Sequence, residues 1–121
     1  ETQSRGLEMI LNNNNIGNIF VAKKNEKIIG MVILLYTIST ALGERVALLE
    51  DMVVSPNERK LGIGSMLLDH AVKYAIENRC KRITLLTDKM NIQAQKFYKQ
   101  HKFKRSSMIP FRMIINNTST K

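Results

Sequence analysis

The sequence holds few of the residues that build disulfide frameworks and metal centres. It has one cysteine, Cys80, and two histidines, His70 and His101. A single thiol cannot close an intramolecular disulfide, and zinc sites draw on several histidines or cysteines. We therefore expect no metal site, and we expect Cys80 to be an inert thiol.

Long apolar runs and tryptophan are also missing. The longest nearly continuous apolar run, from Ile28 to Leu35, is interrupted by Gly30, whereas a membrane-spanning helix needs about 20 apolar residues. No charged and then apolar leader opens the sequence. We therefore predict a cytoplasmic protein with no membrane partner. With three tyrosines and four phenylalanines, the chain offers few surfaces on which bases could stack, which disfavours a nucleic-acid partner.

The composition is that of one ordinary globular domain. The chain has 121 residues, of which 44% are hydrophobic and 24% are charged. Its net charge of +9 is unevenly placed, because residues 1–54 carry −1 and residues 55–121 carry +10. The basic C-terminal half predicts a ligand or partner with several negative charges.

Hydrophobic periodicity predicts an α/β (α+β) fold built on one mixed sheet. Gly30 suggests a bulge or bend in its strand. The expected helices lie at 2–12, 62–78 and 91–100, and the expected strands at 16–24, 27–39, 45–54, 83–87, 103–106 and 111–115. The single domain 1–121 divides into a helical segment at 1–15, strands at 16–54, a ligand-binding and C-terminal part at 55–115, and a tail at 116–121.

The most informative segment joins a buried strand to a long amphipathic helix. Residues 53–54 end the strand, Arg59 and Lys60 follow in a loop, and Gly62 and Gly64 open the helix. N–H groups in the first helical turn lack partners and favour an anion, and glycine lets that anion approach closely. The spacing fits neither the Walker nor the dinucleotide pattern. A phosphate site is therefore predicted, with a tight turn that binds nothing as the alternative.

Three segments share their order and spacing with a known enzyme family. Residues 59–64 read Arg-Lys-Leu-Gly-Ile-Gly, and residues 49–54 read Leu-Glu-Asp-Met-Val-Val. In residues 91–103, an asparagine opens a helix that contains Phe-Tyr, and a phenylalanine follows. Together these segments resemble the signature loop, central strand and later helix of the GNAT superfamily of acetyl-CoA-dependent N-acetyltransferases.

The resemblance implies a fold and a donor. The fold would be a mostly antiparallel sheet of about six strands flanked by helices, with a shortened N-terminal strand and helix. Main-chain groups of Met52 and Val54 would pair with the pantetheine arm of acetyl-CoA as an added strand would, and Asn91 would hydrogen-bond that arm. The resemblance assigns the following residues to acetyl-CoA: Met52, Val53, Val54, Arg59, Lys60, Leu61, Gly62, Ile63, Gly64, Ser65, Asn91 and Tyr98.

The implied reaction is direct attack of a primary amine on the thioester within a ternary complex. Tyr98 would protonate the departing thiolate, and the Met52 amide would stabilise the oxyanion. A carboxylate would take a proton from the amine. Because neighbours on a strand face opposite sides, we expect only one of Glu50 and Asp51 in the cleft, and we favour Glu50.

The partners are less defined. Acidic residues of the N-terminal half suggest as acceptor a cationic small amine or a peptide amine; these residues are Glu8, Glu44, Glu50 and Asp51. An exposed first edge of the sheet could be covered by a second subunit in a homodimer. Two alternatives to an enzyme stay open. The first is a catalytically silent sensor or interaction module that binds acyl-CoA, and the second is a basic nucleic-acid-binding domain, which would bind nucleic acid in a salt-dependent manner.

Overall fold

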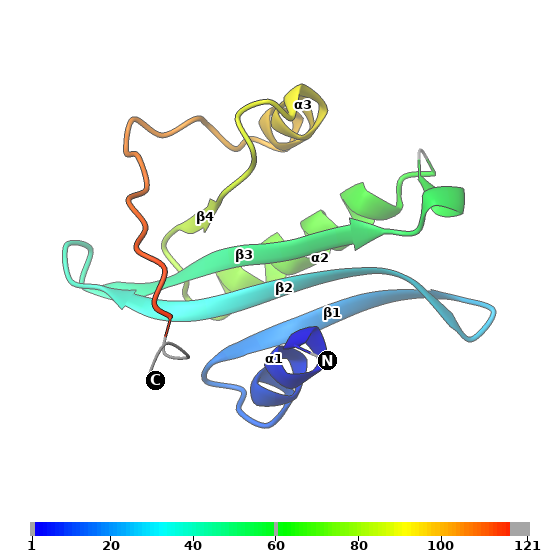
Figure 1. Cartoon of the computed structure of the whole chain (residues 1–121), viewed down its shortest axis with the longest axis horizontal. Helices are drawn as coiled ribbons and strands as arrows, with labels where there is room; N and C mark the ends of the chain where they lie inside the picture. Colours follow the sequence, from blue (N-terminus) through cyan, green and yellow to red (C-terminus); the bar gives the residue numbers. More distant parts are fainter. Residues whose placement is uncertain (1, 60, 117–121) are drawn as a thin grey trace. The chain divides into compact units, whose positions relative to one another are not determined.

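The computed structural model describes residues 2–59 and 61–116 (Figure 1). Its elements, in order, are α1 (Thr2–Leu11), β1 (Gly17–Lys24), β2 (Lys27–Ser39), β3 (Glu44–Val54), the short 3₁₀ helix η1 (Pro56–Glu58), α2 (Ile63–Glu77), β4 (Ile83–Leu85) and α3 (Ile92–Gln100). The chain forms two compact units that meet in sequence between Thr87 and Asp88. That boundary falls inside the predicted part 55–115, and the single domain stays a prediction.

The sheet belongs to the first unit and has the strand order β1-β2-β3-β4. β1, β2 and β3 pair antiparallel, and β4 pairs parallel with β3. The mixed, mostly antiparallel sheet with flanking helices is therefore confirmed, with four strands in the described residues. The strands predicted at 103–106 and 111–115 are wrong, because residues 103–116 are irregular. Apolar residues there suit a strand, but a strand forms only where its N–H and C=O groups find a partner strand, and none of the described strands pairs with these residues.

The core lies between the sheet and α2. Val32 and Leu34 of β2 are fully buried, and being two residues apart they share one face of the sheet. Leu68 of α2 is fully buried as well, and α2 packs on β1, β2 and β3. On the β1 side, the ring of Phe20 meets the ring of Tyr74 edge-on at 5.1 Å. The predicted amphipathic helix thus fixes the orientation of the three long strands.

Turns and bulges set the register of the first hairpin. Lys24 pairs with Lys27 across a two-residue turn whose residues both have positive φ, as the tightest hairpin turns require. Register then slips beside Gly30, which confirms the predicted irregularity. A β-carbon at Gly30 would lie 2.8 Å from Leu67 Cδ1. The glycine therefore allows α2 to pack closely on β2.

Candidate functional site

The second half of β3 has one edge without a strand partner. β4 pairs with β3 only from Ala47 to Leu49 and ends at Leu85. β3 continues to Val54, and no described strand of the first unit pairs with residues 50–54 on that side. Figure 1 shows β4 beside the first part of β3 only. Main-chain groups along this edge are placed to pair with an extended ligand.

A β-bulge lies at the start of this edge. Ile33 pairs with Glu50 and Met31 pairs with Val53, so two residues of β3, Asp51 and Met52, stand opposite one residue of β2. Asp51 has a φ of 52°, in the left-handed region that non-glycine residues rarely adopt. Aspartate tolerates this region better than most residues. Bulges of this kind turn the following backbone and side chains to new directions.

The bulge reverses which residues present their main-chain groups to the open edge. Before it, the Ala47 N–H donates to Arg82 O at 2.9 Å, so odd-numbered residues face β4. After it, the Ser55 N–H donates to Ile29 O at 2.8 Å, so odd-numbered residues face β2. Main-chain groups alternate in direction along a strand, which turns those of Met52 and Val54 to the open edge. A regular strand would present residues 51 and 53 instead.

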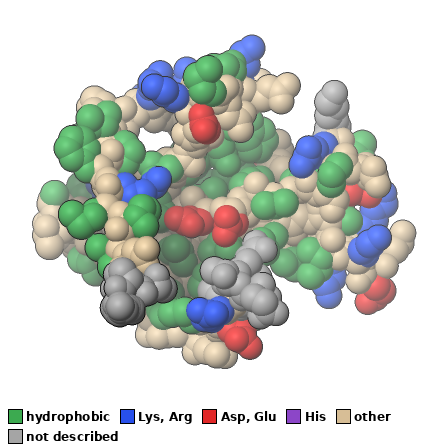
Figure 2. All heavy atoms as spheres, in the orientation of Figure 1, with side chains coloured by type: hydrophobic (Ala, Val, Ile, Leu, Met, Phe, Trp, Pro, Cys, Tyr) green, Lys and Arg blue, Asp and Glu red, His purple; other side chains and the backbone are tan. Residues whose placement is uncertain are grey.

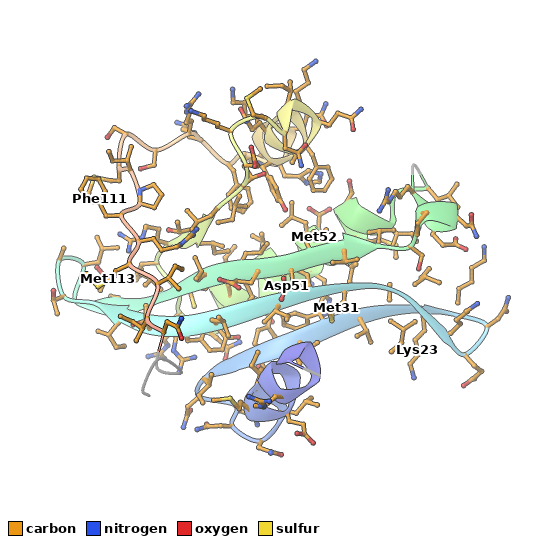
Figure 3. All side chains as sticks on the ribbon, viewed as in Figure 1. Lys23, Met31, Asp51, Met52, Phe111 and Met113 are labelled. Carbon is orange, nitrogen blue, oxygen red and sulfur yellow. The ribbon has the colours of Figure 1, made fainter. Side chains whose placement is uncertain are left out.

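The side chains of Glu50 and Asp51 do not follow the regular alternation of a β-strand between its two faces. Glu50 and Asp51 are both exposed, and the left-handed conformation of Asp51 interrupts the regular strand between them. The expectation that only one of them reaches the cleft was based on regular alternation, which the bulge interrupts, and it stays a prediction. Figure 2 shows acidic side chains next to one another near the middle of the displayed face, and Figure 3 labels Asp51 at this part of β3.

The turn into α2 leaves its helix N-terminus accessible. Gly62 precedes the helix with a φ of 81° and supplies no side-chain cap. A β-carbon at Gly62 would find nothing within 4 Å, so the space beside this backbone is open. Helix N-termini with accessible N–H groups bind anions. The phosphate site predicted at residues 61–65 falls on the end of this loop and the first turn of α2, whereas Lys60 lies outside the described residues.

Arg59 makes a contact that the sequence did not predict. Its Nε donates to the main-chain oxygen of Val54 at 3.2 Å, which is one of the groups at the open edge. The adjacent carboxylate of Glu58 pairs with Lys24 Nζ at 3.3 Å and so ties the loop to β1. No sequence motif signals the Arg59 contact, because it depends on the direction of the Val54 carbonyl.

The remaining predicted residues belong to the second unit. Asn91 caps α3, and its Oδ1 accepts from the Ala94 N–H at 3.0 Å, which leaves its amide N–H groups as donors. The half-buried ring of Tyr98 contacts Phe97 and Phe103 edge-on, with centroids 5.3 Å and 5.7 Å away. Burial raises the pKa of Tyr98 above its ordinary 10.0. Both residues lie in α3 or at its N-cap, in the second unit, whereas the β3 edge belongs to the first unit.

Three further observations concern metal ligands, the single thiol and membrane-spanning helices. Within residues 2–59 and 61–116, no three His, Cys, Asp or Glu side chains are close enough together to hold a metal ion. Burial raises the pKa of the half-buried Cys80 thiol, which favours its unreactive protonated form. No helix in the described part of the chain is long and apolar enough to span a membrane.

Comparison with known proteins gives consistent matches. A model of the acetyltransferase (GNAT) family matches residues 2–103. The uncharacterized N-acetyltransferase YhfO of Bacillus subtilis (strain 168) is 34% identical over 89 residues, which cover 74% of this chain and 60% of that protein. Streptothricin acetyltransferase A of the same organism is 42% identical over 57 residues, or 47% of this chain and 33% of that protein. The chain thus spans 60% or less of these two relatives.

A solved structure extends the comparison to the fold. The crystal structure of a transcriptional regulator from Bacillus halodurans C-125 is 32% identical and superposes with a TM-score of 0.84. The match covers 94% of this chain and 75% of that one. Nearly all of the present chain therefore follows a fold already seen in a relative.

The strained bulge predicts a specific response to substitution at Asp51. Asp51→Val should lower the free energy of unfolding by about 1–3 kcal/mol, because a β-branched residue fits the left-handed region poorly. Asp51→Gly should leave it unchanged or raise it, since glycine adopts positive φ without cost. Urea unfolding checks both, with Glu50→Val as the control at the neighbouring exposed position. Equal losses at both positions would contradict a strained Asp51.

Proposed function

Because the chain belongs to the acetyltransferase (GNAT) family, we propose that it transfers the acetyl group of acetyl-CoA to the primary amine of a small molecule or peptide. The amine attacks the thioester directly in a ternary complex, so no nucleophilic serine or cysteine is needed. The observation that carries the proposal is the bulged, open edge of β3. It presents main-chain groups of Met52 and Val54 where an extended arm with amide groups can pair with them.

The turn into α2 is the proposed binding site for the diphosphate end of acetyl-CoA. N–H groups from Leu61 to Ser65 bind the diphosphate, with the positive end of the helix dipole behind them. The open space at Gly62 allows phosphate oxygens to approach the backbone closely. Arg59 and Lys60 add positive charge from the same loop.

We assign the acid–base chemistry and the oxyanion contact to three residues of the chain. Acetyl-CoA contributes a thioester whose carbonyl carbon is open to attack by an amine. Glu50 takes a proton from the incoming ammonium, directly or through a water molecule, because such amines are mostly charged at neutral pH. The Met52 N–H donates to the carbonyl oxygen as negative charge develops there. Tyr98 keeps its proton, since burial raises its pKa, and gives it to the thiolate as the carbon–sulfur bond breaks. The second proton that the amine nitrogen loses on becoming an amide returns to Tyr98 through solvent.

The acceptor is a cationic amine. Glu50 and Asp51 stand side by side in sequence, both exposed and at the bulge that shapes the edge. Their negative charge attracts an ammonium group before it is deprotonated. The relative named streptothricin acetyltransferase A supports a small molecule as acceptor. A peptide amine is the second candidate within the same class.

Acetyl-CoA binding tests the diphosphate site. Gly62→Glu should weaken binding at least about tenfold, because the new carboxylate occupies the phosphate approach and repels it. Gly43→Glu is the matched control: Gly43 also has a positive φ, of 66°, and open space around it, but it lies in the turn between β2 and β3. Calorimetric titration measures both. Equal affinities for the two variants would contradict the assigned site.

Turnover tests the base. Glu50→Gln should lower kcat/KM about 100-fold for a charged amine while leaving acetyl-CoA affinity nearly unchanged, because the amide cannot accept the proton. Glu77→Gln on α2 is the control carboxylate. Release of the coenzyme thiol is followed with polyamines and amino-terminal peptides as acceptors. A full rate in Glu50→Gln would remove Glu50 from the mechanism.

A separate substitution tests the acid. Tyr98→Phe should lower kcat about tenfold or more with little change in KM, since only protonation of the leaving group is lost. Tyr74→Phe, on α2, is the control for loss of a half-buried hydroxyl. Because its pKa is raised, Tyr98 should remain protonated up to at least pH 10 in the wild type. Binding of acetyl-CoA with no thiol release from any amine would favour the silent sensor instead.

A further inference from the structure

We infer that Arg59 makes the site selective for donors that carry a diphosphate, because in the free chain it occupies a main-chain acceptor that the pantetheine arm would need. This inference rests on the proposed function and adds a second role to Arg59. The same guanidinium blocks the edge when no phosphate is present and binds phosphate when it is. Arg59 is thus a specificity-determining residue.

The Val54 carbonyl oxygen accepts a hydrogen bond on the open edge of β3. The Ser55 N–H bonds to β2, so the main-chain groups of Val54 face the opposite, open edge. Arg59 Nε donates to the Val54 oxygen at 3.2 Å. An incoming amide N–H that pairs with this part of β3 would compete with Arg59 for that oxygen.

The carboxylate next to Arg59 in the loop is already bound to another residue. Glu58, the carboxylate next to Arg59, bonds through both oxygens to Lys24 Nζ, at 3.3 Å and 3.5 Å. Glu58 is thus paired with β1, and Arg59 donates to the neutral carbonyl of Val54. A guanidinium binds phosphate more strongly than a neutral carbonyl, since the charged bond is shorter and can be bidentate. A diphosphate can therefore draw Arg59 away from Val54, whereas a ligand without phosphate cannot.

Selectivity follows because donors with and without a diphosphate differ in what they gain when they displace Arg59. A thioester on pantetheine alone must displace Arg59 and gains nothing in return. A thioester on coenzyme A displaces Arg59 and repays the loss with a phosphate contact. Discrimination between two ligands is the difference between their binding affinities. Arg59 lowers the affinity for acetylpantetheine and raises the affinity for acetyl-CoA.

The experiment measures binding of S-acetylpantetheine and of acetyl-CoA to the wild type, Arg59→Ala and Arg82→Ala. Arg82 is an exposed arginine immediately before β4 and serves as the matched control. Arg59→Ala should bind acetylpantetheine about two- to tenfold more tightly, the worth of one hydrogen bond. It should bind acetyl-CoA more weakly by a similar factor or more. Arg82→Ala should leave both affinities near those of the wild type.

The opposite changes expected in the affinities for acetylpantetheine and acetyl-CoA distinguish the possible roles of Arg59. If Arg59→Ala weakens both ligands, Arg59 only tethers the loop, and the inference is overturned. If acetylpantetheine affinity stays the same, Arg59 is only a phosphate ligand, which also overturns it. If the wild type does not bind acetyl-CoA at all, the proposed function itself fails. Urea unfolding of Arg59→Ala confirms that the variant is folded during these measurements.

Discussion

The candidate site depends on one residue held in an unfavourable backbone conformation. Asp51 adopts a positive φ, and the bulge it forms adds one residue to β3. That single insertion turns the main-chain groups of Met52 and Val54 to the edge that β4 leaves uncovered. The strain is maintained because β2 pairs with β3 on both sides of the bulge. The position of every main-chain contact proposed for the donor follows from this arrangement.

Much of the fold could be predicted from the sequence, since its periodicities are strong and local. The hairpin of β1 and β2, the helix α2 and the junction at Gly62 all lie where apolar spacing and turn residues indicate them. The strands expected at 103–106 and 111–115 failed because strand formation needs a partner as well as suitable residues. Composition does not reveal which partners the folded chain supplies.

The site was predictable as a set of residues but not as a geometry. Motif spacing pointed to residues 52–54 and 61–65, which lie along one edge and the loop that follows it. The bulge was hidden, because aspartate within an apolar strand reads as an ordinary exposed position. The bond from Arg59 to Val54 was hidden as well, since the direction of a carbonyl depends on register. Asn91 and Tyr98 sit in a unit of their own, so their roles remain proposals drawn from motif and chemistry.

Recognition through the main chain has an evolutionary consequence. At the β3 edge, the groups proposed to bind the arm are N–H and C=O groups, which every residue except proline supplies equally. The side chains of Met52 and Val54 can therefore drift without loss of the donor, while those around the carboxylates can be reshaped for a new acceptor. A scaffold organised in this way can keep one acyl source through long divergence and still exchange the molecule it modifies.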